Sequence, residues 1–174
     1  MPNGQQFLRE QALLGAVCGS LQRSHVYVPR VTNAQRRSLG AVLRQELIQR
    51  AVAHVDPVPD NAHLHNIEML CEHVTEACGA FLAEGHLRTG IAQKALNLYL
   101  KYLWCLHYIP EPPHCPFDRR VITHLPPPHN QTNWTHLEGL QAYADLIEAA
   151  RAVAGEESLA AWELRIYQDR ANGA

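Results

Sequence analysis

The chain has 174 residues, of which 47% are hydrophobic, and its formal net charge is −2 with neutral histidines. This length fits one domain, so we expect residues 1–174 to form a single helical domain. The apolar runs are much shorter than the roughly 20 residues of a membrane span. The charge argues against a general nucleic-acid coat protein, which is usually basic.

Cysteine usage and the first residues indicate the compartment. The five cysteines, at positions 18, 71, 78, 105 and 115, are scattered, and none forms a C-x-x-C pair. Reduced thiols are therefore expected, without a disulfide framework or a zinc site. The first residues lack the basic-then-apolar pattern of a signal peptide. We expect a cytoplasmic monomer that needs neither a cofactor nor a metal.

The first predicted helix covers residues 5–23. Its apolar period places Phe7, Leu14, Val17 and Leu21 on the inner face. Residues 26–28 then have strand character and end at a proline.

Capping signals open the next two predicted helices. Thr32 and Gln35 have the spacing of a capping box, which begins a helix that runs to about residue 55. Asp60 or Asn61 is expected to cap a third helix, which ends near residue 83.

A fourth helix is predicted over residues 91–108. The four prolines of residues 110–116 exclude a helix there, because proline lacks an N–H and restricts the residue before it. A short helix should follow over residues 117–124.

The last two helices also have capping signals. Thr135 and Glu138 have capping-box spacing for a helix that ends near Gly155, and Ser158 is placed to cap the final one. The sequence therefore predicts an all-α domain of six to eight helices.

The polar residues of helix 91–108 form one narrow stripe. At about 100° per residue, Gln93, Lys94, Asn97 and Lys101 share one face, while the rest of the helix is almost entirely apolar. A surface helix has a broader polar face, so this helix should be nearly buried. Both lysines of the chain lie on it. A buried lysine must be paired or neutral, and a neutral lysine is a nucleophile.

Two segments resemble the helix–hairpin–helix DNA glycosylases, a family that includes endonuclease III and the oxoguanine glycosylases. Residues 90–100 are similar to the family's Gly-Val-Gly-x-Lys-x-Ala-Asn helix, which carries the Schiff-base lysine. Residues 116–121 are similar to its later Val-Asp-Thr-His-Val segment, which holds the catalytic aspartate. The family's Leu-Pro-Gly hairpin is missing before Thr89, and Ala92 replaces the second glycine.

The resemblance implies an enzyme that flips a damaged or modified base out of DNA and excises it. Lys94 would attack the sugar, with abasic-site lyase chemistry as a consequence, and Asp118 would stabilise the positive charge that develops there. The biological setting would be base-excision repair, or defence against phage DNA that carries modified bases.

The resemblance and the polar stripe also give a set of candidate DNA contacts. These residues are Gly90, Gln93, Asn97, Lys101, His114, Arg119 and Arg120.

Two other functions remain open from the sequence. In a non-catalytic helical binding module, Asp118 would cap a helix and pair with Lys94 as a structural salt bridge. In a small metal-dependent nuclease, the ligands would come from His63, His65, Cys71 and His73.

Overall fold

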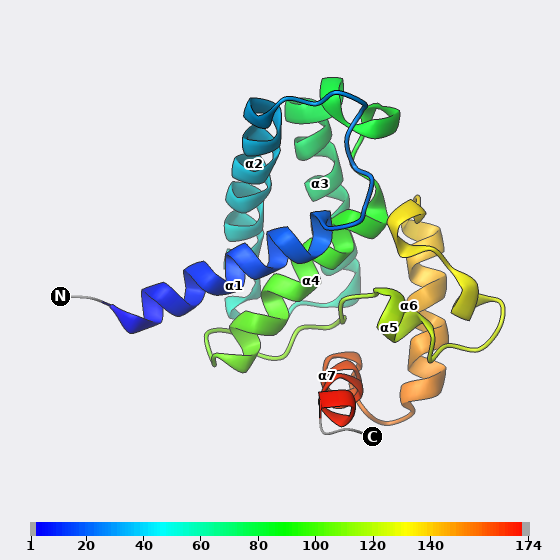
Figure 1. The fold of residues 1–174 in the computed structure, drawn as a ribbon. Helices are drawn as coiled ribbons and strands as arrows, with labels where there is room; N and C mark the ends of the chain where they lie inside the picture. The colour runs from blue at the N-terminus through cyan, green and yellow to red at the C-terminus, as the bar shows by residue number, and fades with distance from the viewer. Residues whose placement is uncertain (1–2, 172–174) are drawn as a thin grey trace.

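The computed structural model describes residues 3–171, which form α-helices and short 3-10 turns and include no β-strand (Figure 1). The α-helices are α1 (Gly4–Leu21), α2 (Asn33–Val52), α3 (Asp60–Cys78), α4 (Thr89–Cys105), α5 (Arg119–Ile122), α6 (Leu140–Ala154) and α7 (Leu159–Ala171). The predicted all-α class with six to eight helices is confirmed. The predicted strand character near residue 27 amounts to one isolated bridge, between Tyr27 and Leu82. None of the described helices is both long and apolar enough to cross a membrane.

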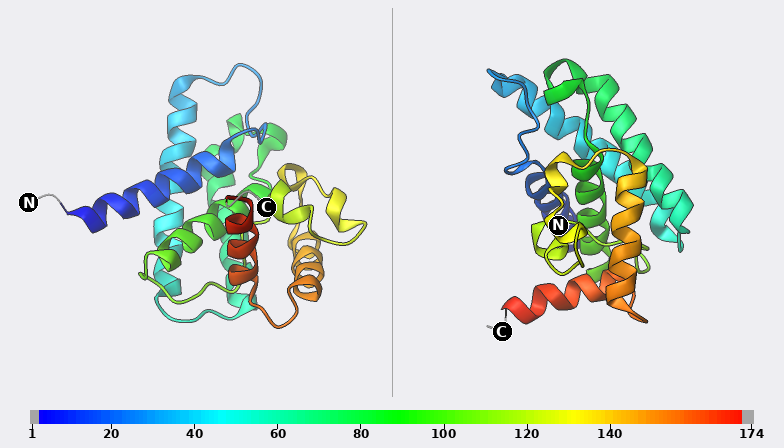
Figure 2. Two further views of the ribbon diagram at one scale, coloured as in Figure 1. Left: turned by 60° about the horizontal axis from the view of Figure 1, so that its bottom comes forward. Right: turned by 90° about the vertical axis from the view of Figure 1, so that its right-hand side faces the viewer.

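Helix α4 lies at the centre of the domain and is buried along most of its length. Helix α1 crosses it, α2 and α3 lie side by side, and α6 packs on another side (Figures 1 and 2). Helix α7 follows α6 after a short loop. Helix α4 carries apolar side chains on nearly all of its sides. Each neighbouring helix can therefore bury its own apolar face against α4.

Local capping chemistry sets two of the predicted helix starts. Thr32 and Gln35 form the expected capping box at α2, with the Gln35 N–H 3.2 Å from the Thr32 hydroxyl. The Ser158 hydroxyl accepts from the Ala161 N–H at 3.1 Å. Both features depend on residues close in sequence, which explains why the pattern predicts them.

Two other predicted caps are wrong. The N-cap of α3 is Pro59, and the Asp60 carboxylate instead pairs with Arg151 of α6. Thr135 does not open α6, which begins at Leu140 after Gly139. Gly139 has a left-handed φ of 80°, and its N–H donates to the Thr89 hydroxyl at 3.0 Å. Long-range contacts therefore override the local signals at these two positions.

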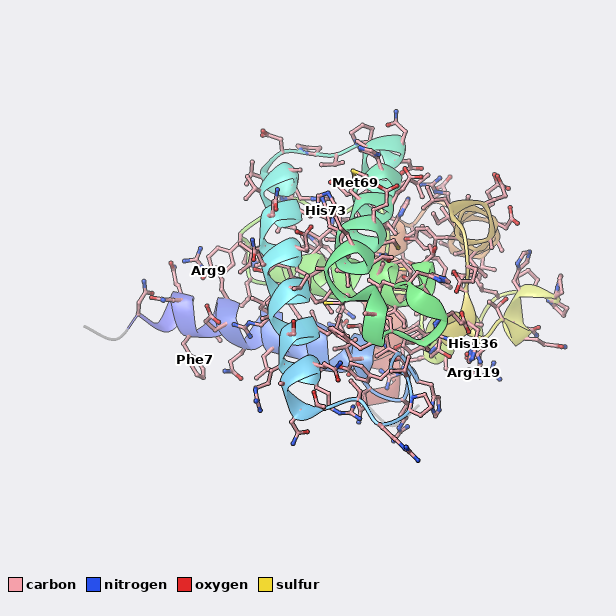
Figure 3. All side chains as sticks on the ribbon, turned by 90° about the horizontal axis from the view of Figure 1, so that it is seen from above. Phe7, Arg9, Met69, His73, Arg119 and His136 are labelled. Carbon is pink, nitrogen blue, oxygen red and sulfur yellow. The ribbon has the colours of Figure 1, made fainter. Side chains whose placement is uncertain are left out.

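The N-terminal part of α1 extends beyond the helices that it packs on (Figures 1 and 2). Phe7 projects from it (Figure 3) with 61% of its surface exposed, and Leu14 is 45% exposed. Leu13 and Val17 are the large residues that α1 buries. The predicted inner face is therefore wrong for Phe7, because the residues that α1 buries begin at Ala12, and for Leu14, because the buried face holds its neighbour Leu13 instead.

Gly90, in the first turn of α4, allows another segment to approach very closely. The 3-10 turn Trp134–His136 lies against it, and a Cβ at this position would overlap the Trp134 carbonyl oxygen. The two nearest atoms belong to the Trp134 backbone, so they cannot move aside as a flexible side chain would. Only glycine fits here.

We predict that Gly90→Ala lowers the free energy of unfolding by about 3 kcal/mol, because the added methyl group displaces the 134–136 turn. The matched control is Gly40→Ala in α2, where a Cβ has no neighbour within 4 Å. This control should raise stability by about 0.5–1 kcal/mol, the helix-propensity gain from glycine to alanine. Urea denaturation measures both changes, and equal stabilities of the two variants would contradict the close approach.

Candidate functional site

Lys94 and Asp118 meet at one site, as the sequence predicts. The Lys94 Nζ lies 3.2 Å from the Asp118 Oδ2. The lysine side chain is 12% exposed and the aspartate side chain 33% exposed. The pair is thus accessible from solvent on the carboxylate side, while the lysine is mostly covered.

The two oxygens of the Asp118 carboxylate have different partners. Oδ1 caps α5 by accepting from the backbone N–H groups of Arg120, at 2.9 Å, and Val121, at 3.4 Å. Oδ2 faces Lys94. The capping role and the pairing role therefore coexist in one side chain, and the cap fixes the carboxylate that Lys94 meets.

Trp134 is a site residue that the sequence analysis did not identify. The Lys94 Nζ lies 4.3 Å from the centroid of the Trp134 ring, within range of a cation–π interaction. The close approach at Gly90 brings this ring over α4. A lone tryptophan in a loop carries no local signal of such a contact, so only the tertiary structure shows it.

The pair opens onto a cavity of about 750 Å³, which we call the cationic cavity. Its basic lining residues are Arg23, His25, Lys94, Arg119, Arg120 and His136, and Asp118 is its one carboxylate. Arg119 and His136 lie at the same edge of the molecule (Figure 3). Such a lining attracts anions such as phosphate groups.

The backbone at one edge of the cationic cavity is strained. Arg23 and His25 have left-handed φ values of 60° and 48°. Non-glycine residues adopt this region at a cost of about 1–3 kcal/mol, and such strain often occurs at functional sites. Here it turns the chain after α1 so that both residues line the cavity.

Gln93 and Asn97 are placed differently from the prediction, which made them DNA contacts. Both side chains are completely buried. The Gln93 amide donates to the Phe117 carbonyl at 2.7 Å and accepts from the Phe117 N–H at 3.1 Å. The Asn97 amide donates to the Cys115 carbonyl at 3.0 Å. These two residues hold segment 115–117 on α4 and so position Asp118, which corrects their predicted role.

We predict that Gln93→Ala lowers the free energy of unfolding by about 2–4 kcal/mol. The change leaves the buried N–H and C=O of Phe117 without partners, and each costs about 1–3 kcal/mol. Gln141→Ala on the exposed face of α6 is the control and should change stability by less than about 0.5 kcal/mol. Urea denaturation measures both changes. A loss of similar size in both variants would contradict the role of Gln93 in holding segment 115–117 on α4.

Three further predicted DNA contacts are also engaged inside the protein. The Gly90 N–H donates to the Leu137 carbonyl at 3.0 Å, so it is not free for a phosphate. Lys101 is 7% exposed and pairs with Glu163 of α7 at 2.6 Å. His114 is 1% exposed. Burial removes these residues from direct contact with a DNA backbone.

The predicted arginines do reach the surface. Arg119 is exposed and donates to the Asn130 carbonyl at 3.3 Å. Arg120 is partly buried and stacks on the Tyr167 ring, 4.1 Å from its centroid. Both line the cationic cavity, so their expected role as phosphate contacts remains a prediction that the geometry permits.

A buried polar network lies behind the site. The His63 Nε2 donates to the Asn97 Oδ1 at 2.8 Å, and the His54 ring contacts His63 at 2.9 Å. The Tyr143 hydroxyl accepts from the Asn97 amide at 2.9 Å and contacts the His114 Nδ1 at 3.0 Å. The network therefore joins helices α3, α4 and α6 around one asparagine.

The histidines of this network are neutral. Burial lowers the pKa of His114 to about 3, and the nearby charge of Arg151 acts in the same direction. Asp60 lies 3.5 Å from this ring, but its carboxylate is already paired with Arg151. Burial, with the neighbouring rings of His114 and His54, holds the pKa of His63 well below its usual range.

These shifts predict that acid destabilises the fold. The unfolded chain takes up protons at His63 and His114 below about pH 6.5, whereas the folded chain does not. Stability from these two groups is therefore complete above pH 6.5 and falls by up to about 1.4 kcal/mol per pH unit per histidine below it. Urea denaturation between pH 7 and 5 measures the slope, and His114→Gln should make it shallower. A stability independent of pH in this window would contradict the neutral state.

The predicted alternative metal site does not assemble. His63 belongs to the buried network, whereas the His73 Nδ1 lies 3.1 Å from a Glu46 oxygen and the His65 Nδ1 lies 3.4 Å from a Glu68 oxygen. Within residues 3–171, a different group of three potential ligands has the spacing of a metal site, with ligand atoms within 4.8 Å of one another. It consists of Glu84, His86 and Glu138. This group is largely exposed, and the His86 Nε2 already lies 3.1 Å from a Glu138 oxygen.

Comparisons of the chain with protein-family models, with curated proteins and with solved structures found no match.

Proposed function

We propose that the protein is a DNA glycosylase that excises a damaged or modified base, with Lys94 and Asp118 at the reaction centre. The observation that carries the proposal is the 3.2 Å contact between the Lys94 Nζ and the Asp118 Oδ2 at the wall of the cationic cavity. An amine beside a carboxylate is suited to attack at a sugar carbon. The basic side chains around the pair suit the phosphates on either side of that sugar.

The proposed reaction begins when Lys94 loses its proton to water, which leaves the Asp118 carboxylate charged. The neutral amine then attacks C1′ of the deoxyribose as the bond to the base breaks, and the electron pair leaves with the base, which takes up a proton from water. Asp118 stabilises the positive charge that develops on the sugar ring. The amine proton passes to the ring oxygen as the C1′–O4′ bond breaks, which gives a Schiff base between Lys94 and the sugar. Loss of a C2′ proton to water then eliminates the 3′-phosphate.

Borohydride trapping tests the Schiff base directly. The chain has only two lysines, Lys94 and Lys101, besides the N-terminal amine. Incubation with a duplex that carries an abasic site, followed by borohydride and peptide mapping, should place the DNA on Lys94. Lys94→Arg keeps the charge beside Asp118 but has no primary amine, and it should reduce trapping by about 100-fold or more. Lys101→Arg is the matched control and should trap like the wild type.

The role of Asp118 has a separate test. Asp118→Asn retains an oxygen that can cap α5 but removes the charge. Excision from a panel of duplexes with oxidised, deaminated or alkylated bases should fall by about 10²-fold or more, the typical cost of losing one electrostatic stabiliser. Full excision activity in this variant would contradict the assigned role.

The outcomes also separate the other functions. If the wild-type protein neither forms the trapped adduct nor excises a base, the Lys94–Asp118 pair is a structural salt bridge in a binding module. If chelation by EDTA abolishes cleavage of DNA, a metal-dependent nuclease explains the activity instead.

A further inference from the structure

The outward face of helix α1, opposite the residues that it buries, carries no charge. The two charged residues of α1 are Arg9 and Glu10. Arg9 lies over the Tyr108 ring, 5.1 Å from its centroid, and Glu10 pairs with Arg44 of α2 at 2.6 Å. Phe7 projects from the side of the helix opposite Arg9 (Figure 3). Both charges are thus engaged with the body of the domain, and uncharged side chains are left to meet solvent.

This outward face has the spacing of a coiled-coil seam. Residues separated alternately by three and four positions share one side of a helix, which is the a and d pattern of a heptad. Phe7 and Leu14 occupy the two d positions and are 61% and 45% exposed. Leu8, which borders the seam, is 46% exposed. The a and d positions, all of them exposed, are Gly4, Phe7, Gln11, Leu14 and Cys18. In coiled coils a second helix covers such a seam.

The seam is complementary to itself in one arrangement. If a second α1 runs antiparallel with Gln11 opposite Gln11, Phe7 of each copy lies opposite Leu14 of the other. Gly4, which has no side chain, then lies opposite Cys18. The two central amides can hydrogen-bond each other, and a single polar residue at an a position specifies the register of a coiled coil. The pattern therefore favours a second copy of this chain over an unrelated helix.

The shape of the domain accommodates this arrangement. The first part of α1 projects beyond the body, and its buried residues begin at Ala12 (Figures 1 and 2). Antiparallel pairing about Gln11 places the projecting part of each helix on the supported part of the other, with the two bodies at opposite ends. A cavity of about 300 Å³ borders the seam, and its lining includes Leu8, Gly15 and Tyr102. Leu8 of the second copy lies beside Gly15 and can fill this space.

We propose that the protein forms a weak antiparallel dimer through the outward face of α1, with Gln11 at the two-fold axis. The contact is isologous, because each copy contributes the same face. The seam from Gly4 to Cys18 is about 21 Å long, so one helix pair of this length buries less surface than a standard interface. The expected dissociation constant is therefore about 10–100 µM. The protein is then a weak dimer rather than the monomer expected from its sequence.

Sedimentation equilibrium at protein concentrations on either side of this value tests the dimer. Phe7→Glu and Leu14→Glu each bring one carboxylate per copy into the seam and should weaken dimerisation by about 100-fold or more. Val153→Glu on α6 is the matched control, because Val153 is 43% exposed and lies on a different helix. It should dimerise like the wild type. All three positions are exposed, so urea denaturation at low concentration should show a folded monomer in each variant.

Cross-linking tests the antiparallel register. The background carries Cys18→Ser and Cys105→Ser, which remove the exposed native cysteines. Gln11→Cys then places two thiols face to face, where the Cα separation of about 4.4–6.8 Å that a disulfide needs can be reached. Leu14→Cys leaves its two thiols about 9 Å apart along the helix axis, which is too far. Oxidation should therefore give a covalent dimer with Gln11→Cys and little with Leu14→Cys.

Several results would contradict the dimer. A wild-type protein that stays monomeric well above the expected dissociation constant would overturn it, and so would wild-type dimerisation of both Phe7→Glu and Leu14→Glu. Efficient cross-linking through Leu14→Cys, or through Cys18 in the wild type, would overturn the antiparallel arrangement, because equivalent residues at these positions meet only in a parallel pair.

Discussion

The arrangement of the candidate site depends on two buried amide side chains one turn apart on α4. Gln93 and Asn97 bond the backbone of Phe117 and Cys115, in a segment whose prolines exclude regular structure. Amides suit this task because each can donate and accept without a charge in the core. Segment 115–117 is thereby fixed on α4, and Asp118 follows it directly. The position of the carboxylate beside Lys94 is a consequence of this clamp.

The two lysines of α4 have different surroundings although they lie only two turns apart. Lys101 is enclosed with Glu163, so its charge is neutralised within the protein. Lys94 instead meets a carboxylate that is one-third exposed and an indole ring. A cavity with cationic walls opens at Lys94. This difference in solvent access explains why we assign reactivity to Lys94 and a structural role to Lys101.

The core behind the site is unusually polar. Asn97 connects His63 of α3 with Tyr143 of α6, and His114 continues the network toward Asp60. Each buried polar group would cost free energy if its partner were lost, so the network accepts few alternative packings. We infer that it fixes the orientation of α3 and α6 around α4, and thereby supports the clamp.

The sequence by itself determined the helical class, the narrow polar stripe of α4 and the caps at Thr32 and Ser158. These features depend on periodicity and on residues within one turn of each other. The pairing of Lys94 with Asp118 was also predictable, from the resemblance of two short segments. The burial of Gln93, Asn97 and His114, the ring of Trp134 over Lys94 and the partner of Asp60 were decided only by the tertiary structure. Each depends on contacts between residues at least 18 positions apart, for which a single sequence carries no local signal.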